Sequence, residues 1–212
     1  MKTFLFQGDS ITDCGRSRDN DNWPGSGYPL LVEAALGTDA PGEYRFVNRG
    51  VSGDKIDDVC ARLQADILDV APDYMSLLIG VNDVWHRLDR GDPIDKAAYE
   101  KSYDELLQNI RATLPQTKLF LLEPFILRAA ATDDRPDMPD RYNAFLAHMR
   151  DFAAVVKRLA KKYNLTFVEL QHVFDEAAEK AEPSYWLADG VHPTVKGHEL
   201  IKRELLKAFQ AF

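Results

Sequence analysis

Short apolar runs alternate along this chain with longer amphipathic segments, and this alternation limits the possible folds more than any other feature. The short runs are rich in Phe, Leu, Val and Ile and are almost uninterrupted, which is typical of strands buried on both faces. They occupy residues 3–7, 44–48, 74–79, 118–124 and 165–170. We therefore expect five strands, none of which has a solvent-exposed face.

The segments between these runs carry apolar residues at intervals of three or four, as on one face of a helix. The stripes consist of Ile56, Val59, Leu63 and Ile67; of Tyr99, Tyr103, Leu106, Ile110 and Leu114; of Tyr142, Phe145, Met149, Phe152, Val156 and Leu159; and of Ile201, Leu205 and Phe209. Strands that alternate with helices predict right-handed crossovers and an α/β fold whose parallel sheet has helices on both faces. No repeat or linker divides the sequence, so we expect one domain over residues 1–212.

The charge and the apolar content exclude several classes of protein. The formal net charge of −8 disfavours binding to nucleic acid or to an anionic membrane surface. No apolar run approaches the roughly 20 residues that span a bilayer, and the N-terminal run is too short for a signal peptide, so we expect a cytoplasmic protein. Cys14 and Cys60 lack metal-ligand spacing and are interpreted as reduced structural residues. With no glycine fingerprint for a nucleotide either, we expect neither a metal nor a cofactor.

Small and polar residues follow the predicted strands, at the edge where parallel sheets bind ligands. Ser10 lies at the turn out of the first run, where a serine hydroxyl can act as a nucleophile if a base takes its proton. His192, just before the last helical stripe, is the candidate base. Asp189 precedes it by three residues, close enough for its carboxylate to orient the imidazole. We therefore predict a catalytic triad of Ser10, Asp189 and His192.

Acyl transfer also needs hydrogen-bond donors that face the developing oxyanion. The candidates are the backbone N–H of Ser10, the backbone N–H of Gly50 and the side-chain amide of Asn82. Each has a structural alternative, because Ser and Asn cap helices and Gly permits tight turns. Their joint occurrence at the predicted ligand-binding edge favours catalysis.

Four sequence blocks, in this order, resemble those of the SGNH (GDSL-type) hydrolases. They are Gly-Asp-Ser at 8–10, Asn-Arg-Gly-Val-Ser-Gly at 48–53, Gly-Val-Asn-Asp at 80–83 and Asp-Gly-Val-His-Pro at 189–193. The resemblance implies a flavodoxin-like three-layer α/β/α sandwich. It also implies that Ser10, Gly50, Asn82 and His192 are the four residues that give the family its name, with Asp189 as the aspartate of the last block. Ile11 stands where the short name GDSL has leucine.

The segments 8–16 and 81–85 are similar to those of intracellular acetylxylan esterases of this family. Those proteins often carry an aromatic residue just before the final aspartate, where this chain has Ala188, with Trp186 two positions earlier. We therefore expect a serine esterase that hydrolyses short acyl esters, acetyl above all, on a carbohydrate and through an acyl-enzyme. Trp85 and Trp186 are the candidate substrate-binding residues, since aromatic rings stack on sugars.

Two other functions remain open at this stage. A thioesterase or lysophospholipase would use the same triad, and a non-catalytic module could bind acylated glycans without cleaving them. In each case the expected partner is a small-molecule or oligosaccharide acyl ester, and the chain could form a homo-oligomer. The polar segments 13–27 and 127–140 are long for connections in such a domain and are candidate functional loops.

Overall fold

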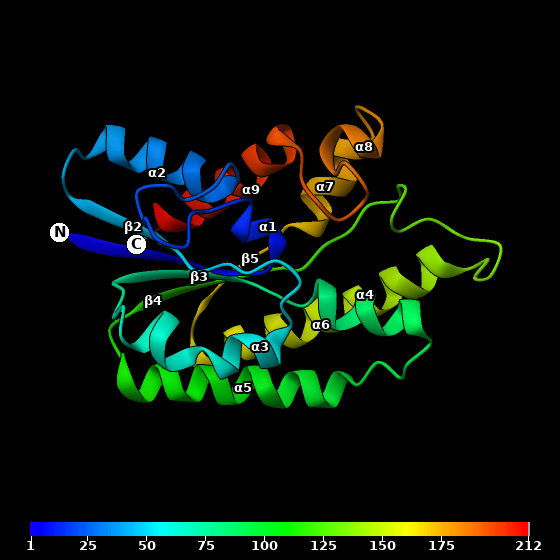
Figure 1. Ribbon diagram of the computed structural model, residues 1–212, viewed down its shortest axis with the longest axis horizontal. Coiled ribbons are helices and arrows are strands. Elements are labelled where there is room, and N and C mark those ends of the chain that lie inside the picture. Colours follow the sequence, from blue (N-terminus) through cyan, green and yellow to red (C-terminus); the bar gives the residue numbers. More distant parts are fainter. Residues whose placement is uncertain (212) are drawn as a thin grey trace.

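A parallel five-stranded sheet forms the centre of the computed structural model, which describes residues 1–211 (Figure 1). The strand order is β2-β1-β3-β4-β5, the arrangement of flavodoxin-like proteins. The strands are β1 (Lys2–Gly8), β2 (Tyr44–Asn48), β3 (Tyr74–Leu78), β4 (Lys118–Leu122) and β5 (Thr166–Val168). The predicted flavodoxin-like α/β/α class is thereby confirmed.

Strand β1 lies between β2 and β3 and is paired with both. Phe6 is paired with Asn48 of β2, and Gly8 is paired with Leu78 of β3. Phe4, Leu5 and Phe6 are fully buried, because helices cover both faces of the sheet here. The register brings the ends of β1, β2 and β3 to one edge, so the residues that follow these strands emerge close together.

Helices cover the sheet from two sides (Figure 1). One layer contains α2 and α9, which pack against each other, with α7 and α8 nearby; α3, α5 and α6 form the other layer. The helical segments are α1 (Ser10–Asp13), α2 (Tyr28–Asp39), α3 (Ile56–Ala61), the π-helical turn η1 (Gln64–Leu68), α4 (Val81–Arg90), α5 (Lys96–Thr113), α6 (Arg141–Tyr163), α7 (Gln171–Ala178), α8 (Pro183–Trp186) and α9 (Val195–Phe209). Within residues 1–211, no helix has the length and apolar content needed to cross a bilayer.

Some helices carry no stripe that the sequence could reveal. The apolar residues of α2 lie all round the helix instead of on one face, so the three-or-four spacing is lost. The stripe from Ile56 to Ile67 belongs to two elements, since α3 ends at Ala61 and η1 begins at Gln64. A wider turn of this kind preserves the apolar face while interrupting the regular helix.

Candidate active site

Ser10 is held just after the end of β1 by a tight turn. Gly8 ends β1, and a Cβ atom at this position would lie 2.3 Å from the Leu78 carbonyl oxygen, so only glycine fits. Asp9 is the N-cap of α1, and its carboxylate accepts a 3.0 Å hydrogen bond from the Ile11 N–H. Ser10 is therefore the first residue of the helix, where a backbone N–H has no acceptor within the helix.

The three residues predicted as a triad form an unbroken hydrogen-bonded series. Ser10 Oγ lies 2.9 Å from His192 Nε2. On the other side of the ring, His192 Nδ1 lies 2.7 Å from Asp189 Oδ2. The second carboxylate oxygen, Asp189 Oδ1, accepts the backbone N–H of His192 at 2.8 Å. Asp189 thus fixes both the backbone and the ring of the histidine.

The turn that carries Asp189 and His192 is held from outside by the segment 127–140. The Leu127 N–H donates to the Gly190 carbonyl at 2.9 Å, and the Ala131 N–H donates to the Asp189 carbonyl at 2.7 Å. Gly190 has a φ of +99°, a conformation that favours glycine. The long polar loop therefore supports the backbone of the site.

The hydrogen bonds determine the charge of the pair. The hydrogen bond that His192 donates to Asp189, reinforced by the charge of the carboxylate, raises the pKa of His192 above the ordinary value, although burial opposes this shift. Burial raises the pKa of Asp189, but the hydrogen bonds from His192 and Val191 outweigh it and lower the pKa to about 2. Asp189 is consequently ionised at neutral pH. When His192 is neutral with its hydrogen on Nδ1, Asp189 accepts this N–H and Nε2 faces Ser10 Oγ as an acceptor.

Two other carboxylates lie near the site but face elsewhere. Asp83 accepts the Ile56 N–H, and Asp9 accepts the Ile11 N–H. Burial raises the pKa of Asp9 to about 7 and that of Asp83 to about 8. Asp189 is thus the fully ionised carboxylate in contact with the imidazole.

Asn82 is the second residue of α4, which follows β3. Its side chain is buried, and Nδ2 donates one hydrogen to the Asp54 carbonyl at 3.0 Å. A side-chain amide has two hydrogens on this nitrogen, so one remains for a substrate oxygen. The contact with Asp54 also fixes the direction in which the amide points.

The Gly50 N–H is already engaged, because it donates to Asn48 Oδ1 at 2.9 Å. An oxyanion at this N–H would have to share it with Asn48. The Gly50 carbonyl oxygen, in turn, accepts hydrogen bonds from Arg16 Nε at 2.7 Å and Arg18 Nη1 at 2.9 Å. Two guanidinium groups thus hold this peptide in position, an arrangement that no local sequence pattern indicated.

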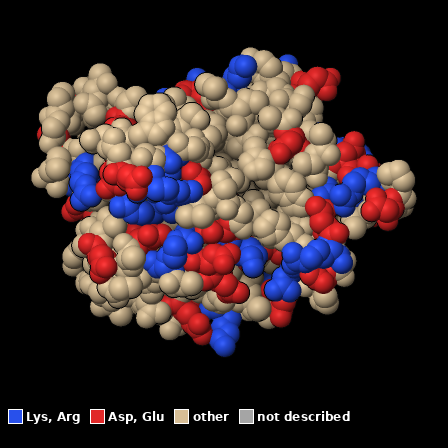
Figure 2. Space-filling view, in the orientation of Figure 1, with Lys and Arg blue, Asp and Glu red and all other residues tan. Residues whose placement is uncertain are grey.

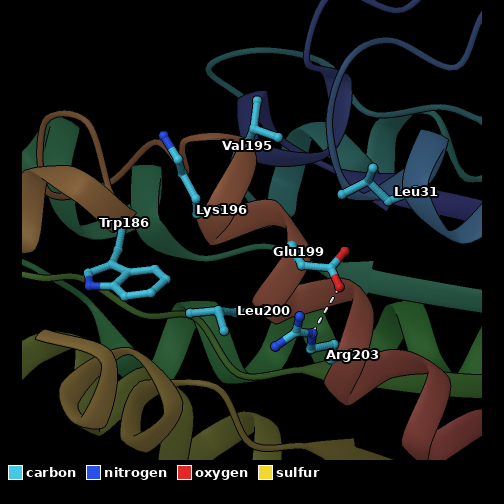
Figure 3. Close-up of a pocket in the computed structure, with 7 residues that line it drawn as sticks. All are labelled: Leu31, Trp186, Val195, Lys196, Glu199, Leu200 and Arg203. Carbon is cyan, nitrogen blue, oxygen red and sulfur yellow. Dashed lines mark hydrogen bonds and ion pairs between the residues drawn. The ribbon is translucent and has the colours of Figure 1, made fainter. Parts of the chain in front are cut away.

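The two tryptophans expected to bind substrate lie in different places. The ring centroid of Trp85 is 5.9 Å from that of His192, so Trp85 flanks the candidate base. Trp186, at the end of α8, lines a separate groove together with residues of α2 and α9, and Figure 3 shows Trp186 and Leu31 on opposite sides of the α9 residues. The lining of the groove includes none of Ser10, Asn82 and His192.

Charged side chains of both signs are interspersed over the face of the molecule shown in Figure 2. Within residues 1–211, no group of His, Cys, Asp and Glu side chains has the arrangement of a metal site. Cys14 and Cys60 carry free thiols.

Comparison with known proteins agrees with this geometry. The GDSL-like lipase/acylhydrolase family matches residues 6–200. The chain belongs to this family. It is 34% identical over 210 residues to an acetylxylan esterase of Geobacillus stearothermophilus, a match that covers 96% of this chain and 91% of that protein. These findings make the chain a carboxylic-ester hydrolase.

Solved structures give the same relationship. A protein described as a GDSL-like lipase, from Parabacteroides merdae, superposes with a TM-score of 0.89 at 36% identity, covering 98% of this chain and 94% of that one. The acetylxylan esterase Axe2 of G. stearothermophilus superposes with a TM-score of 0.83 at 30% identity, covering 98% of this chain and 93% of that one.

Proposed function

We propose that this hydrolase is a serine esterase that releases short acyl groups, chiefly acetyl, from a carbohydrate through an acyl-enzyme. The observation that carries the proposal is the continuous series from Ser10 Oγ through the His192 ring to Asp189. The 2.9 Å between Ser10 Oγ and His192 Nε2 is short enough for proton transfer, and the 2.7 Å between His192 Nδ1 and Asp189 Oδ2 is short enough for the carboxylate to orient the ring.

In the first half-reaction, Ser10 Oγ attacks the ester carbonyl carbon while His192 Nε2 takes the hydroxyl proton. The carbonyl oxygen becomes an oxyanion, which the Ser10 N–H, the Asn82 amide and the shared Gly50 N–H stabilise. The tetrahedral intermediate then collapses, the alcohol leaves with the proton from His192, and the acyl group stays on Ser10. In the second half-reaction, His192 takes a proton from water, whose oxygen attacks the acyl carbon. The bond from the acyl carbon to Ser10 Oγ then breaks, Ser10 takes the proton back from His192, and the acid leaves.

The chain's relatives support the choice of acyl group and alcohol. Two solved forms of Axe2 are described as catalytic mutants, one with a serine and one with an aspartate replaced by alanine. Axe2 is an acetylxylan esterase, and one of its variants is described as an acetyl-xylooligosaccharide esterase. We extend that substrate class to this chain: an acetylated small molecule or oligosaccharide.

The test measures acetate release from acetylated xylosides, together with a series of alkyl esters from acetate to octanoate. We expect acetate esters to be cleaved with the highest kcat/KM. A preference for octanoate or for acyl thioesters would replace the proposal with a lysophospholipase or a thioesterase.

A fluorophosphonate probe, which reacts with activated serines, tests the nucleophile. We expect the wild type and Ser184→Ala, a control at an exposed serine of α8, to be labelled and active. Ser10→Ala should be neither, with activity lower by about 10⁴–10⁶. Labelled and active Ser10→Ala protein would exclude Ser10. Failure of the wild type to react would favour the non-catalytic glycan-binding module, which membership of a hydrolase family already disfavours.

A further inference from the structure

Trp85 lies beside the part of the site where the alcohol must leave. It follows Asn82 by three residues on α4, so the two side chains share one helix face. The Trp85 and His192 rings are inclined at 51°, and on its other side Trp85 contacts Phe145 at a centroid distance of 6.4 Å. Because His192 gives its proton to the departing alcohol, a ring beside His192 meets the alcohol part of the ester.

A carboxylate on the same helix fixes the indole. Trp85 Nε1 donates a 2.8 Å hydrogen bond to Asp89 Oδ2, one helical turn further on. The other oxygen, Asp89 Oδ1, accepts from Arg141 Nη2 at 2.7 Å and from Arg135 Nη2 at 2.8 Å. Burial raises the pKa of Asp89, but the hydrogen bonds and charges of these arginines outweigh it and lower the pKa. Asp89 is therefore a charged acceptor for the indole N–H.

Arg141 is the unusual member of this group, because its side chain is only 1% exposed. A buried guanidinium is costly, and an apolar side chain of similar size is often equally stabilising or more so. The charge at this position is therefore poorly explained by stability. The charge of Arg141 is explained if its role is to hold the Asp89 carboxylate in one place.

The same group reaches the backbone of Asp189. Arg141 Nη1 donates to the Ala131 carbonyl at 2.5 Å, and the Ala131 N–H donates to the Asp189 carbonyl at 2.7 Å. The segment 127–140 thus connects the anchor of Trp85 with the backbone of Asp189. One assembly sets the distance between the aromatic ring and the candidate triad.

We propose that Asp89 and Arg141 are positioning residues that hold Trp85 as a platform for the alcohol part of the ester, a flat ring such as a pyranose. This inference rests on the proposed function, because it takes His192 as the group that protonates the alcohol. Asp89 and Arg141 act through Trp85 and contact no reacting atom.

The test compares three acetates: methyl acetate, benzyl acetate and an acetylated methyl xyloside. Each variant is compared with the wild type on the same ester, so differences in the acidity of the leaving alcohols cancel. Methyl acetate has no ring, benzyl acetate has a ring without hydroxyl groups, and the xyloside is a sugar. For wild type and each variant, kcat and KM are measured on all three. The readout is the ratio of kcat/KM for each ring ester to that for methyl acetate, which a general loss of folded protein does not change.

We expect Trp85→Ala to lower this ratio about three- to tenfold, mainly because KM for the ring esters rises when the aromatic contact is lost. Trp85→Phe keeps a ring, removes the N–H and leaves the Asp89–Arg141 pair intact, so it does not endanger the fold. It should lower the ratio about two- to fourfold, by releasing the ring from Asp89. Asp92→Ala, which removes an exposed carboxylate paired with Arg90 just beyond α4, is the control and should leave the ratio unchanged.

Asp89→Asn, alone and combined with Trp85→Phe, decides whether Asp89 acts through the indole. We expect Asp89→Asn to lower the ratio in the wild type and to have no further effect in Trp85→Phe. Equal effects in both backgrounds, or an unchanged ratio in Trp85→Phe and Trp85→Ala, would overturn the inference. A wild type that cleaves benzyl acetate but not the xyloside would overturn the carbohydrate part of the proposed function. In that case the ratio for benzyl acetate would still show whether Asp89 positions Trp85.

Discussion

The α-carbon of Gly50 faces the backbone of Asp13 so closely that a Cβ atom on Gly50 would lie 2.5 Å from the Asp13 nitrogen. The sequence indicated the N–H of this glycine as a candidate donor to the oxyanion. The structure gives a reason for glycine at this position, which is that α1 occupies the space of the missing side chain. The position of Gly50 and the position of Ser10 at the start of α1 are therefore linked.

Gly50→Ala should displace α1 and with it Ser10. We expect kcat to fall about 100-fold, since a shift of about 1 Å in the reacting groups costs a loss of this size. Steady-state kinetics on a short acetate ester, with circular dichroism to follow unfolding, measure both effects. Normal kcat in a folded Gly50→Ala protein would show that α1 can yield without moving Ser10.

Gly37→Ala is the matched control and carries its own prediction. Gly37 lies within α2, and a Cβ atom there would meet no other atom within 4 Å. Alanine in the interior of a helix is more stable than glycine by about 0.5–1 kcal/mol, so the thermal midpoint should rise by a few degrees with unchanged kcat. A lower midpoint would mean that α2 needs a flexible residue at this position.

Gly190→Ala tests the support that the segment 127–140 gives to the turn carrying Asp189 and His192. A Cβ atom would lie 2.5 Å from Thr132 Oγ1 and 2.6 Å from the Leu127 carbonyl oxygen, in a backbone with φ +99°. We expect lower stability and a kcat/KM reduced at least tenfold, because Asp189 would move with the turn. Thermal unfolding and kinetics measured on one sample separate the loss of stability from the loss of kcat/KM. Full activity in the folded variant would contradict the proposal that the segment 127–140 holds Asp189 in position.

Asn82→Ala should lower kcat by about 10²–10³ with a smaller change in KM, since the amide meets a charge that exists mainly in the transition state. Asn109→Ala is the control, because Asn109 also donates from Nδ2 to a backbone carbonyl, on the exposed face of α5. A change confined to KM would assign Asn82 to ordinary substrate binding.

Local patterns indicated much of this architecture. Apolar runs revealed the strands, and Ser10, Asn82 and His192 could be placed at the ligand-binding edge because each follows a strand or precedes a helix. The spacing of Asp189 and His192 also indicated their contact, since three residues span one turn.

Contacts between distant segments could not be predicted in this way. Arg16 and Arg18 bind Gly50 across more than 30 residues, and Arg141 binds Asp89 across 52. Pairs this far apart in the sequence leave no periodic signal. The contact between Trp85 and Asp89 is different, because a spacing of four residues on a helix could have suggested it. The side-chain direction of Trp186 depends on how α8 packs on α9, which the sequence around it does not encode.

The final prediction concerns pH. Asp189 stabilises protonated His192, so the pKa of His192 lies above the ordinary 6.5. Because the base must be neutral, kcat/KM should rise with pH through that raised pKa. Asp189→Asn removes the negative charge and the orienting acceptor, so the rising limb should move to lower pH while the rate falls about 10⁴-fold.

Asp104→Asn, at another carboxylate with a lowered pKa, is the control and should change neither the position of the rising limb nor the rate. The profiles should be recorded on two acetates with different alcohols, because a limb that depends on the alcohol would report a step other than proton transfer. A limb that stays in place in Asp189→Asn, at a near-normal rate, would remove Asp189 from the proposed triad.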